Sequence, residues 1–112
     1  MARHPFAPPN AQRTDFAYTV RVRFEWDPEK ARENLRKHGV SFEEGATAFG
    51  DWASITVPDP EHSIGEERYY LLGVSDRGNL LLVRHTDRGD ITRIISVWRA
   101  NSRQRRQYAE RH

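Results

Sequence analysis

The stretch LLLVRHTDRGDITRIISVW, from Leu80 to Trp98, decides the fold that the sequence predicts. Two apolar runs rich in β-branched residues flank a short polar segment with a glycine, a pattern typical of a β-hairpin. An Arg-Gly pair suits a two-residue turn poorly, because both turn positions need a positive φ. We therefore predict a three-residue loop, from Asp87 to Gly89, with Gly89 in the left-handed region.

This loop length determines which side chains share a face of the hairpin. It pairs Val83 with Arg93, so that His85 and Arg93 become diagonal neighbours on one face. A group that can transfer protons beside a fixed cation is costly inside an apolar hairpin unless it is used or satisfied. We therefore predict that the hairpin holds the active region. A two-residue loop would instead place Arg84 opposite Arg93 and turn His85 to the other face.

The composition predicts a single cytoplasmic domain without disulfides. A chain of 112 residues can bury about two thirds of its unfolded surface without covalent staples. The chain has no cysteine, which fits a reducing compartment, and no apolar run approaches the roughly 20 residues of a membrane span. Residues 1–19 contain three prolines and no sustained periodicity, so we expect a flexible extension before a domain at 20–112.

Arginine residues gather at the two ends of the chain, although the formal net charge is only +2. Residues 1–23 hold four arginines against one aspartate, and residues 99–112 hold five arginines against one glutamate. Clustered arginine is typical of a surface that binds phosphate or an acidic partner. It is equally typical of a solvated helix face, so both interpretations stay open.

Apolar periodicity and helix caps predict an antiparallel sheet with helices packed on it. Asp27, Ser41 and Asn101 each precede a segment with the pattern of a helix start. Hairpin-length connections join the later strands, which indicates an α+β domain. In chain order, the predicted elements are a strand at 18–26, helices at 28–38 and 42–49, strands at 53–57, 68–74, 80–86 and 90–98, and a helix at 102–110.

Three stretches between Phe24 and Ser96 resemble the BrnT family of ribonuclease toxins: FEWDPEKARENLRKHGVSFEEGATAF, DPEHSIGEERYYLLG and HTDRGDITRIIS. The resemblance implies a RelE-like fold and a small bacterial ribonuclease of a type II toxin-antitoxin system that inhibits translation. It also implies a BrnA-type antitoxin, a ribbon-helix-helix protein that neutralises the toxin and represses their operon. Operator DNA would then be contacted only through the antitoxin.

The resemblance also implies which residues form the site. The matching positions are Lys37 and His38 in a K-H-G block, Glu67 and Arg68 in an E-x-R block, and His85, Arg88 and Arg93 in an H-T-x-R…R block. One position departs from the pattern, because family members commonly continue I-S-A-R-x-A where this chain has Trp98 in place of the arginine. Either Arg99 takes over that role or the contact with RNA is weakened.

RNA cleavage without a metal needs a base for the 2′-hydroxyl, an acid for the leaving 5′-oxygen and cations for the phosphorane charge. We predict His85 as the first proton-transfer candidate. The other predicted catalytic residues are Arg93, Arg68, Glu67 and His38. The predicted RNA-binding residues are Lys37, Arg88, Arg99, Arg103 and Tyr108, the last as an exposed base-stacking ring. No zinc spacing or P-loop is present in the sequence, so we expect no cofactor.

Each of these residues also has a structural interpretation. His85 could be a strand histidine hydrogen-bonded to the backbone, and His38 could stabilise a helix C-terminus. His62, in a proline-bounded loop, is either an acid or an ordinary surface histidine. Arg93 could form a buried bridge with Asp90, Glu66 or Glu67. A binding module without catalysis, using the same basic surface for nucleic acid or an acidic partner, is the alternative function.

Overall fold

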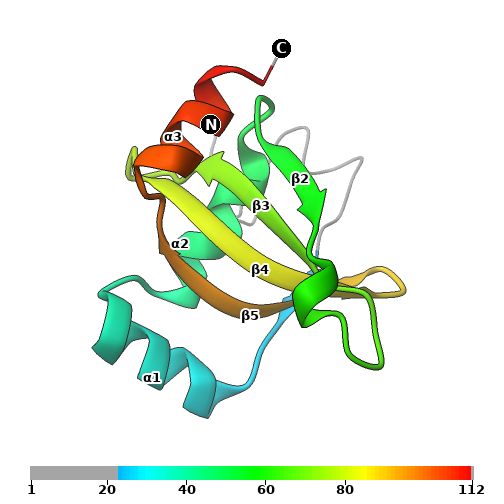
Figure 1. The fold of residues 1–112 in the computed structure, drawn as a ribbon. Coiled ribbons are helices and arrows are strands. Elements are labelled where there is room, and N and C mark those ends of the chain that lie inside the picture. The colour runs from blue at the N-terminus through cyan, green and yellow to red at the C-terminus, as the bar shows by residue number, and fades with distance from the viewer. Residues whose placement is uncertain (1–22, 112) are drawn as a thin grey trace, which may run out of the picture.

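The computed structural model describes residues 23–111 of the chain as a mixed α+β domain (Figure 1). The predicted order of strands and helices is confirmed, with two short 3-10 turns added. The elements are β1 (Arg23–Glu25), α1 (Pro28–His38), α2 (Phe42–Thr47), η2 (Ala48–Gly50), β2 (Ile55–Pro58), η3 (Pro60–His62), β3 (Tyr69–Val74), β4 (Leu80–Arg88), β5 (Ile91–Arg99) and α3 (Ser102–Ala109). The expected extension at 1–19 lies outside the described residues. Among the helices of residues 23–111, none has the length and apolar character needed to cross a bilayer.

The helices begin and end where the sequence predicts. The side chains of Asp27 and Ser41 accept hydrogen bonds from the backbone at the starts of α1 and α2. Asn101 and Gln104 form a reciprocal capping box at the start of α3. Gly39, with φ of 70°, ends α1 in a left-handed conformation that a side chain would strain.

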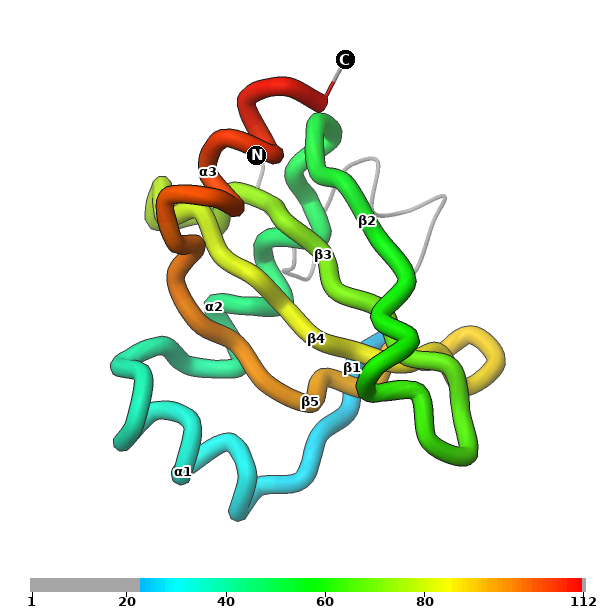
Figure 2. Tube along the Cα trace, in the orientation of Figure 1, coloured from blue at the N-terminus to red at the C-terminus, as the bar shows by residue number. Residues whose placement is uncertain are grey.

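The five strands form one sheet in the order β1-β5-β4-β3-β2 (Figure 2). The pairs from β2 to β5 are antiparallel, as predicted. β1 instead runs parallel to β5, and it pairs only with the first three residues of that strand, from Ile91 to Arg93. The rest of the outer edge of β5 is therefore left for other partners.

The sheet has an apolar layer on each face. Phe42 of α2 packs against buried residues of the sheet, including Val83 and Val97, on one face. On the other face, Leu72 and Leu82 form a smaller cluster against which Tyr108 of α3 packs. Helix α3 therefore lies across the sheet from α2, and the second face is only partly covered.

The hairpin of β4 and β5 differs from the predicted register. Its loop contains two residues, Gly89 and Asp90, rather than three, because Arg88 pairs with Ile91. Gly89 is left-handed as predicted, with φ of 65°. Gly89 alone at the first loop position meets the need for positive φ, so Arg88 is spared that strain.

A β-bulge changes the register a second time. Arg84 pairs with Ser96, whereas His85 pairs with Ile94, so β5 carries one extra residue at this point. Thr86 pairs with Arg93, which puts His85 and Arg93 on opposite faces of the sheet. The predicted juxtaposition of His85 and Arg93 is therefore wrong.

Asn34 joins α1 to the free edge of β5. Its side-chain amide donates to the carbonyl oxygen of Val97 at 2.8 Å and to that of Val40 at 3.0 Å. Its carbonyl oxygen accepts from the backbone N–H of Val97 at 3.1 Å. Asn34 is 6% exposed, so these contacts satisfy backbone groups that water does not reach. The side chain acts as a short substitute for a neighbouring strand.

Gly73 in β3 allows the sheet to approach the η2 turn closely. A Cβ atom at Gly73 would lie 2.7 Å from the backbone oxygen of Ala48, whereas one at Gly50 would meet nothing within 4 Å. We expect Gly73→Ala to lower the free energy of unfolding by about 2 kcal/mol, because the backbone must shift. Gly50→Ala is the control, with an expected change within about 0.5 kcal/mol. Urea unfolding measures both, and equal stabilities would contradict this packing.

Candidate functional site

A groove of about 510 Å³ crosses the partly covered face of the sheet. Its floor is formed by side chains of the three central strands, including Tyr70, Arg84 and Trp98. Helix α3 forms one wall and the η3 turn forms the other, as the red and green segments in Figure 1 show. We call this hollow the α3 groove. The remaining residues that line it are Asp59, Glu61, His62, Leu82, Asn101, Arg103, Gln104, Arg106, Gln107 and Glu110.

Asp59 links the wall of the α3 groove to its floor. One carboxylate oxygen lies 3.0 Å from Nδ1 of His62, and the other accepts from Nε of Arg84 at 2.8 Å. Asp59 is 8% exposed, and burial alone would raise its pKa. Hydrogen bonds from His62 and Arg84 outweigh burial and hold the pKa of Asp59 below its ordinary value. Asp59 is therefore an ionised hydrogen-bond acceptor for both partners.

Trp98 separates the α3 groove from a second hollow of about 480 Å³. The guanidinium carbon of Arg84 lies 4.9 Å from the centre of the indole. On the other side, the ring of His38 lies 5.7 Å from that of Trp98, and Lys37 and Arg99 complete the second hollow. The three predicted residues Lys37, His38 and Arg99 thus lie together beside Trp98.

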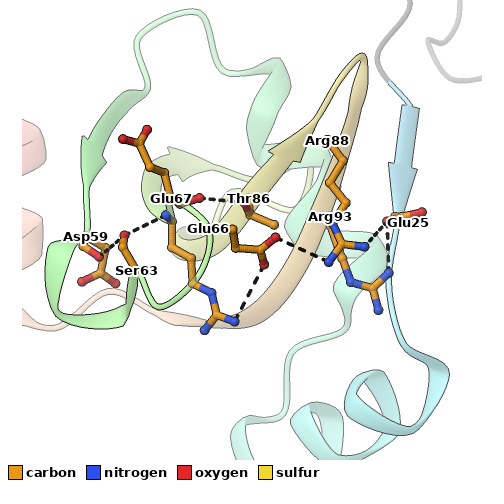
Figure 3. A network of polar contacts seen from close by, with 9 residues as sticks. Glu25, Asp59, Ser63, Glu66, Glu67, Thr86, Arg88 and Arg93 are labelled. Atoms are coloured by element: carbon orange, nitrogen blue, oxygen red, sulfur yellow. Dashed lines mark hydrogen bonds and ion pairs between the residues drawn. The ribbon is translucent and has the colours of Figure 1, made fainter.

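A network of three arginines and two glutamates lies beyond the groove, toward the hairpin end (Figure 3). A guanidinium nitrogen of Arg88 lies 3.6 Å from Glu25, and its other terminal nitrogen lies 3.5 Å from Glu66. Arg93 donates to Glu25 at 3.1 Å. Arg68 is 3.9 Å from Glu66, and its buried Nε has no hydrogen-bond partner within the described residues. Arg68, Arg88 and Arg93 are therefore brought together, with carboxylates sharing their charge.

The predicted pairing of Arg93 is wrong in its partner. Its carboxylate contact is Glu25 of β1, and Asp90, Glu66 and Glu67 do not pair with it among residues 23–111. The parallel pairing of β1 with β5 places Glu25 opposite Arg93, which explains the choice. Sequence spacing indicated nearby carboxylates and had no means of selecting one 68 residues away.

His85 and Glu67 lie apart from these arginines. His85 is 3% exposed and its ring contacts Phe49, with ring centres 4.9 Å apart. The ring of Tyr69 stacks on His85 at 5.9 Å, and the Tyr69 hydroxyl donates to Glu67 at 2.7 Å. Nδ1 of His85 lies 3.2 Å from the carbonyl oxygen of Val83. This is the backbone-bonded arrangement that was the structural alternative, and a catalytic role for His85 stays a prediction.

Burial makes His85 a source of acid sensitivity. The pKa of His85 is lowered because burial disfavours the cation, and its hydrogen bond to Val83 and the charge of Asp87 offset this only in part. The unfolded chain therefore binds a proton at higher pH than the folded one. We expect stability to fall as pH drops below about 6.5, by at most about 1.4 kcal/mol per pH unit for this one proton.

The matched variant for this prediction is His85→Gln, which keeps a side-chain donor for the Val83 carbonyl but does not titrate. Urea unfolding at pH 7.5 and at pH 5.5 should show a smaller loss of stability in the variant than in the unaltered protein. Equal losses in both proteins would contradict the expected effect of His85.

Helix α3 confirms one part of the expected RNA-binding surface and corrects another. Arg103 lies on the groove wall, as do other arginines of this helix. Tyr108 is only partly exposed, so its predicted exposure is wrong. Its hydroxyl donates to Asp51 at 2.5 Å and the guanidinium of Arg111 covers its ring at 3.9 Å. Tyr108 thus anchors α3 to the sheet.

Asp59 and Arg84 are site residues that sequence reasoning missed, and His62 was interpreted chiefly as a surface residue. The signal was the three-residue spacing of Asp59 and His62 in a loop bounded by prolines, which brings both onto one 3-10 turn. Among the described residues, no group of three or more His, Cys, Asp or Glu side chains is placed to hold a metal ion.

Comparison with known proteins supports the family resemblance. A family model described as "Ribonuclease toxin, BrnT, of type II toxin-antitoxin system" matches residues 26–104. The crystal structure of the Brucella abortus ribonuclease toxin BrnT is similar, with a TM-score of 0.57 and 19% sequence identity, covering 72% of this chain and 99% of that one. A search of the curated proteins finds no match. Because the family model covers most of the chain, this protein belongs to the BrnT family of ribonuclease toxins of type II toxin-antitoxin systems.

Proposed function

We propose that this protein is an endoribonuclease that works without a metal ion, binds RNA in the α3 groove and inhibits translation in the cytoplasm by cleaving it. The observation that carries this proposal is the groove itself, where arginine, histidine and aromatic side chains meet on one open face. Arginine binds phosphate through a planar fork, and aromatic rings stack with bases. The groove thus combines the two contacts that single-stranded RNA requires.

The arginines of α3 support binding of a polyanion. No carboxylate in residues 23–111 lies within ion-pair distance of Arg103, Arg105 or Arg106. Arginines along one helix without acidic partners leave their charge available to phosphate groups. We propose that α3 binds the RNA backbone.

Trp98 supports a path for RNA beyond the groove. It lines both hollows, so a strand that crosses it would pass from the α3 groove to Lys37 and Arg99. A base stacked on an aromatic ring contributes roughly 1 to 3 kcal/mol to binding. This placement supports Lys37 and Arg99 as RNA-binding residues, and it gives Trp98 a role in place of the arginine found in related proteins.

The Arg68, Arg88 and Arg93 network lies beside this path and supports a role in binding phosphate. Glu25 and Glu66 already pair with these arginines. A phosphate would therefore compete with two carboxylates, and we propose that RNA rearranges these ion pairs. His85 and Glu67, on the other face, keep only their predicted roles.

Cleavage by the purified protein in EDTA tests the proposed activity. We expect RNA fragments with 2′,3′-cyclic phosphate and 5′-hydroxyl ends, because the 2′-hydroxyl is the nucleophile when no metal activates water. RNA substituted with 2′-deoxyribose at every position should resist cleavage. Salt-sensitive binding of RNA without any turnover would instead support the alternative of a binding module.

We propose that the antitoxin partner implied by the family is a BrnA-type ribbon-helix-helix protein, and that the pair forms a hetero-oligomer. Operator DNA would be contacted through that antitoxin. Co-expression with the product of the adjacent reading frame, followed by size-exclusion chromatography, should give one tight complex in which RNA cleavage is lost. Independent elution of the two proteins with undiminished cleavage would contradict this partner.

A further inference from the structure

The η3 turn holds His62 in a fixed place beside the groove. The backbone N–H of His62 donates to the carbonyl oxygen of Asp59 at 3.1 Å, and Ser63 Oγ donates to the same oxygen at 2.9 Å. The N–H of Asp59 in turn donates to the carbonyl oxygen of Arg68 at 2.9 Å, which ties the turn to the start of β3. The position of His62 is therefore set by the backbone as well as by its own side chain.

The contact with Asp59 fixes which nitrogen of His62 can accept a proton. An ionised carboxylate only accepts hydrogen bonds, so Nδ1 of His62, 3.0 Å away, carries the hydrogen of the neutral ring. Nε2 is then left with its lone pair. The side chain of His62 is 46% exposed where it lines the α3 groove, so Nε2 is accessible to a bound substrate. A carboxylate that orients an imidazole in this way is a common device of acid-base catalysis.

Arg84 supplies a cation next to the same carboxylate. Its Nε is occupied by Asp59 and its Nη1 lies 3.4 Å from Ser96 Oγ, while its plane sits over Trp98. A guanidinium has five N–H donors, so groups remain that can bind phosphate oxygens. A base and a phosphate-binding cation thus share Asp59 as their common support.

We propose that His62 is the general base of the ribonuclease, with Asp59 as its positioning residue, an inference that rests on the proposed function. Nε2 of His62 takes the proton from a 2′-hydroxyl as the 2′-oxygen forms a bond to phosphorus. The bond from phosphorus to the 5′-oxygen breaks, and that oxygen takes a proton from water. The products are a 2′,3′-cyclic phosphate and a 5′-hydroxyl, and hydroxide reclaims the proton from His62.

This assignment replaces the hairpin histidine for geometric reasons. His85 is 3% exposed, and its ring lies between Phe49 and Tyr69 on the face covered by α2. A base must reach the proton it removes to within hydrogen-bond distance, directly or through one water. His62 lines an open groove and meets that requirement.

The charged groups around His62 are known from the lining of the α3 groove. Asp59 and Glu61 lie on its own turn, Arg84 lies on β4, and Arg103, Arg106 and Glu110 lie on α3. Removing one of them shifts the pH profile of cleavage, whereas removing His62 should abolish the limb of the profile that reports protonation of the base.

The test measures single-turnover cleavage of an RNA that contains one ribose among deoxyriboses. We expect His62→Gln to lower the cleavage rate by about 10² to 10⁴-fold and to remove the acidic limb of the pH profile. Affinity for the all-deoxy analogue should stay within about threefold of that of the unaltered protein, since Gln keeps the groove polar. Asp59→Asn should lower the rate while keeping a shifted acidic limb. Arg32→Gln, on the exposed face of α1, is the control with unchanged cleavage.

A second variant guards against loss of fold. His62→Gly leaves space for free imidazole, which should restore cleavage in proportion to its concentration. Full cleavage by His62→Gln with the limb intact would overturn this inference alone and leave the ribonuclease proposal standing. Absence of cleavage by the unaltered protein would overturn the proposed function, and this inference with it.

Discussion

Replacing Asn34 by alanine is expected to lower the free energy of unfolding by about 3 to 5 kcal/mol, since each buried polar group left unpaired costs about 1 to 3 kcal/mol. The change removes three hydrogen bonds, two with the backbone of Val97 and one with that of Val40. Water cannot replace them readily at a residue that is 6% exposed. Urea unfolding followed by circular dichroism measures the loss.

Two comparisons make this prediction specific. Asn101→Ala, at the exposed start of α3, removes another asparagine with a structural hydrogen bond and should cost only about 1 kcal/mol. Asn34→Asp turns two donors toward a carboxylate oxygen that faces two carbonyls, so it should destabilise the protein at pH 7 and recover partly when acid protonates it. Similar stabilities of the Asn34→Ala and Asn101→Ala variants would contradict the edge-strand role of Asn34.

Replacing Arg84 by methionine is expected to damage both folding and RNA cleavage. Breaking a buried ion pair from one side costs about 3 to 5 kcal/mol, because a buried charge remains. The side chains of Arg84 and Asp59 are only 17% and 10% exposed, so the rule applies here. Loss of a cation that stabilises the phosphorane should also lower the cleavage rate by about 10² to 10³-fold.

A double variant separates the two effects. Asp59→Asn combined with Arg84→Met removes both charges, so it should recover much of the stability lost in Arg84→Met alone. Cleavage should stay low, because neither the cation nor the support of His62 returns. Recovery of cleavage together with stability would show that Arg84 acts only on folding.

Local signals predicted most of the fold. The N-caps at Asp27, Ser41 and Asn101 and the left-handed Gly39 act within a few residues, so their outcome depends little on the rest of the chain. The order of strands and helices followed from them. The parallel pairing of β1 depends on a partner more than 60 residues away, and nothing in the sequence of β1 indicated it.

The hairpin shows where pattern reasoning failed. The presence of both strands and the left-handed Gly89 are confirmed, but the loop is one residue shorter than predicted and a bulge opposite Arg84 and His85 shifts the pairing again. Side chains alternate faces with every residue, so a change of one in the register moves a whole set of side chains to the other face. The hypothesis that joined His85 to Arg93 depended wholly on that register.

The candidate site was only partly accessible to sequence reasoning. Asp59 and His62 are three residues apart, so their contact is local and could have been weighed more strongly. The α3 groove joins η3 to a helix some 40 residues later, and only the folded chain brings these segments together. Composition predicted the arginines of α3 correctly as a cluster, but not which face of the sheet they would border.

One comparison of cleavage rates tests most directly whether RNA is bound and cut in the α3 groove. The double variant Arg103→Gln/Arg106→Gln removes two charges from the groove wall, and Arg32→Gln/Arg36→Gln removes two from exposed positions on α1. We expect the first pair to lower cleavage in EDTA at least about 10-fold and to reduce the salt dependence of RNA binding by about two phosphate contacts. The α1 pair should leave both unchanged. Equal cleavage by the two double variants, or a loss confined to the α1 pair, would contradict a site in the α3 groove.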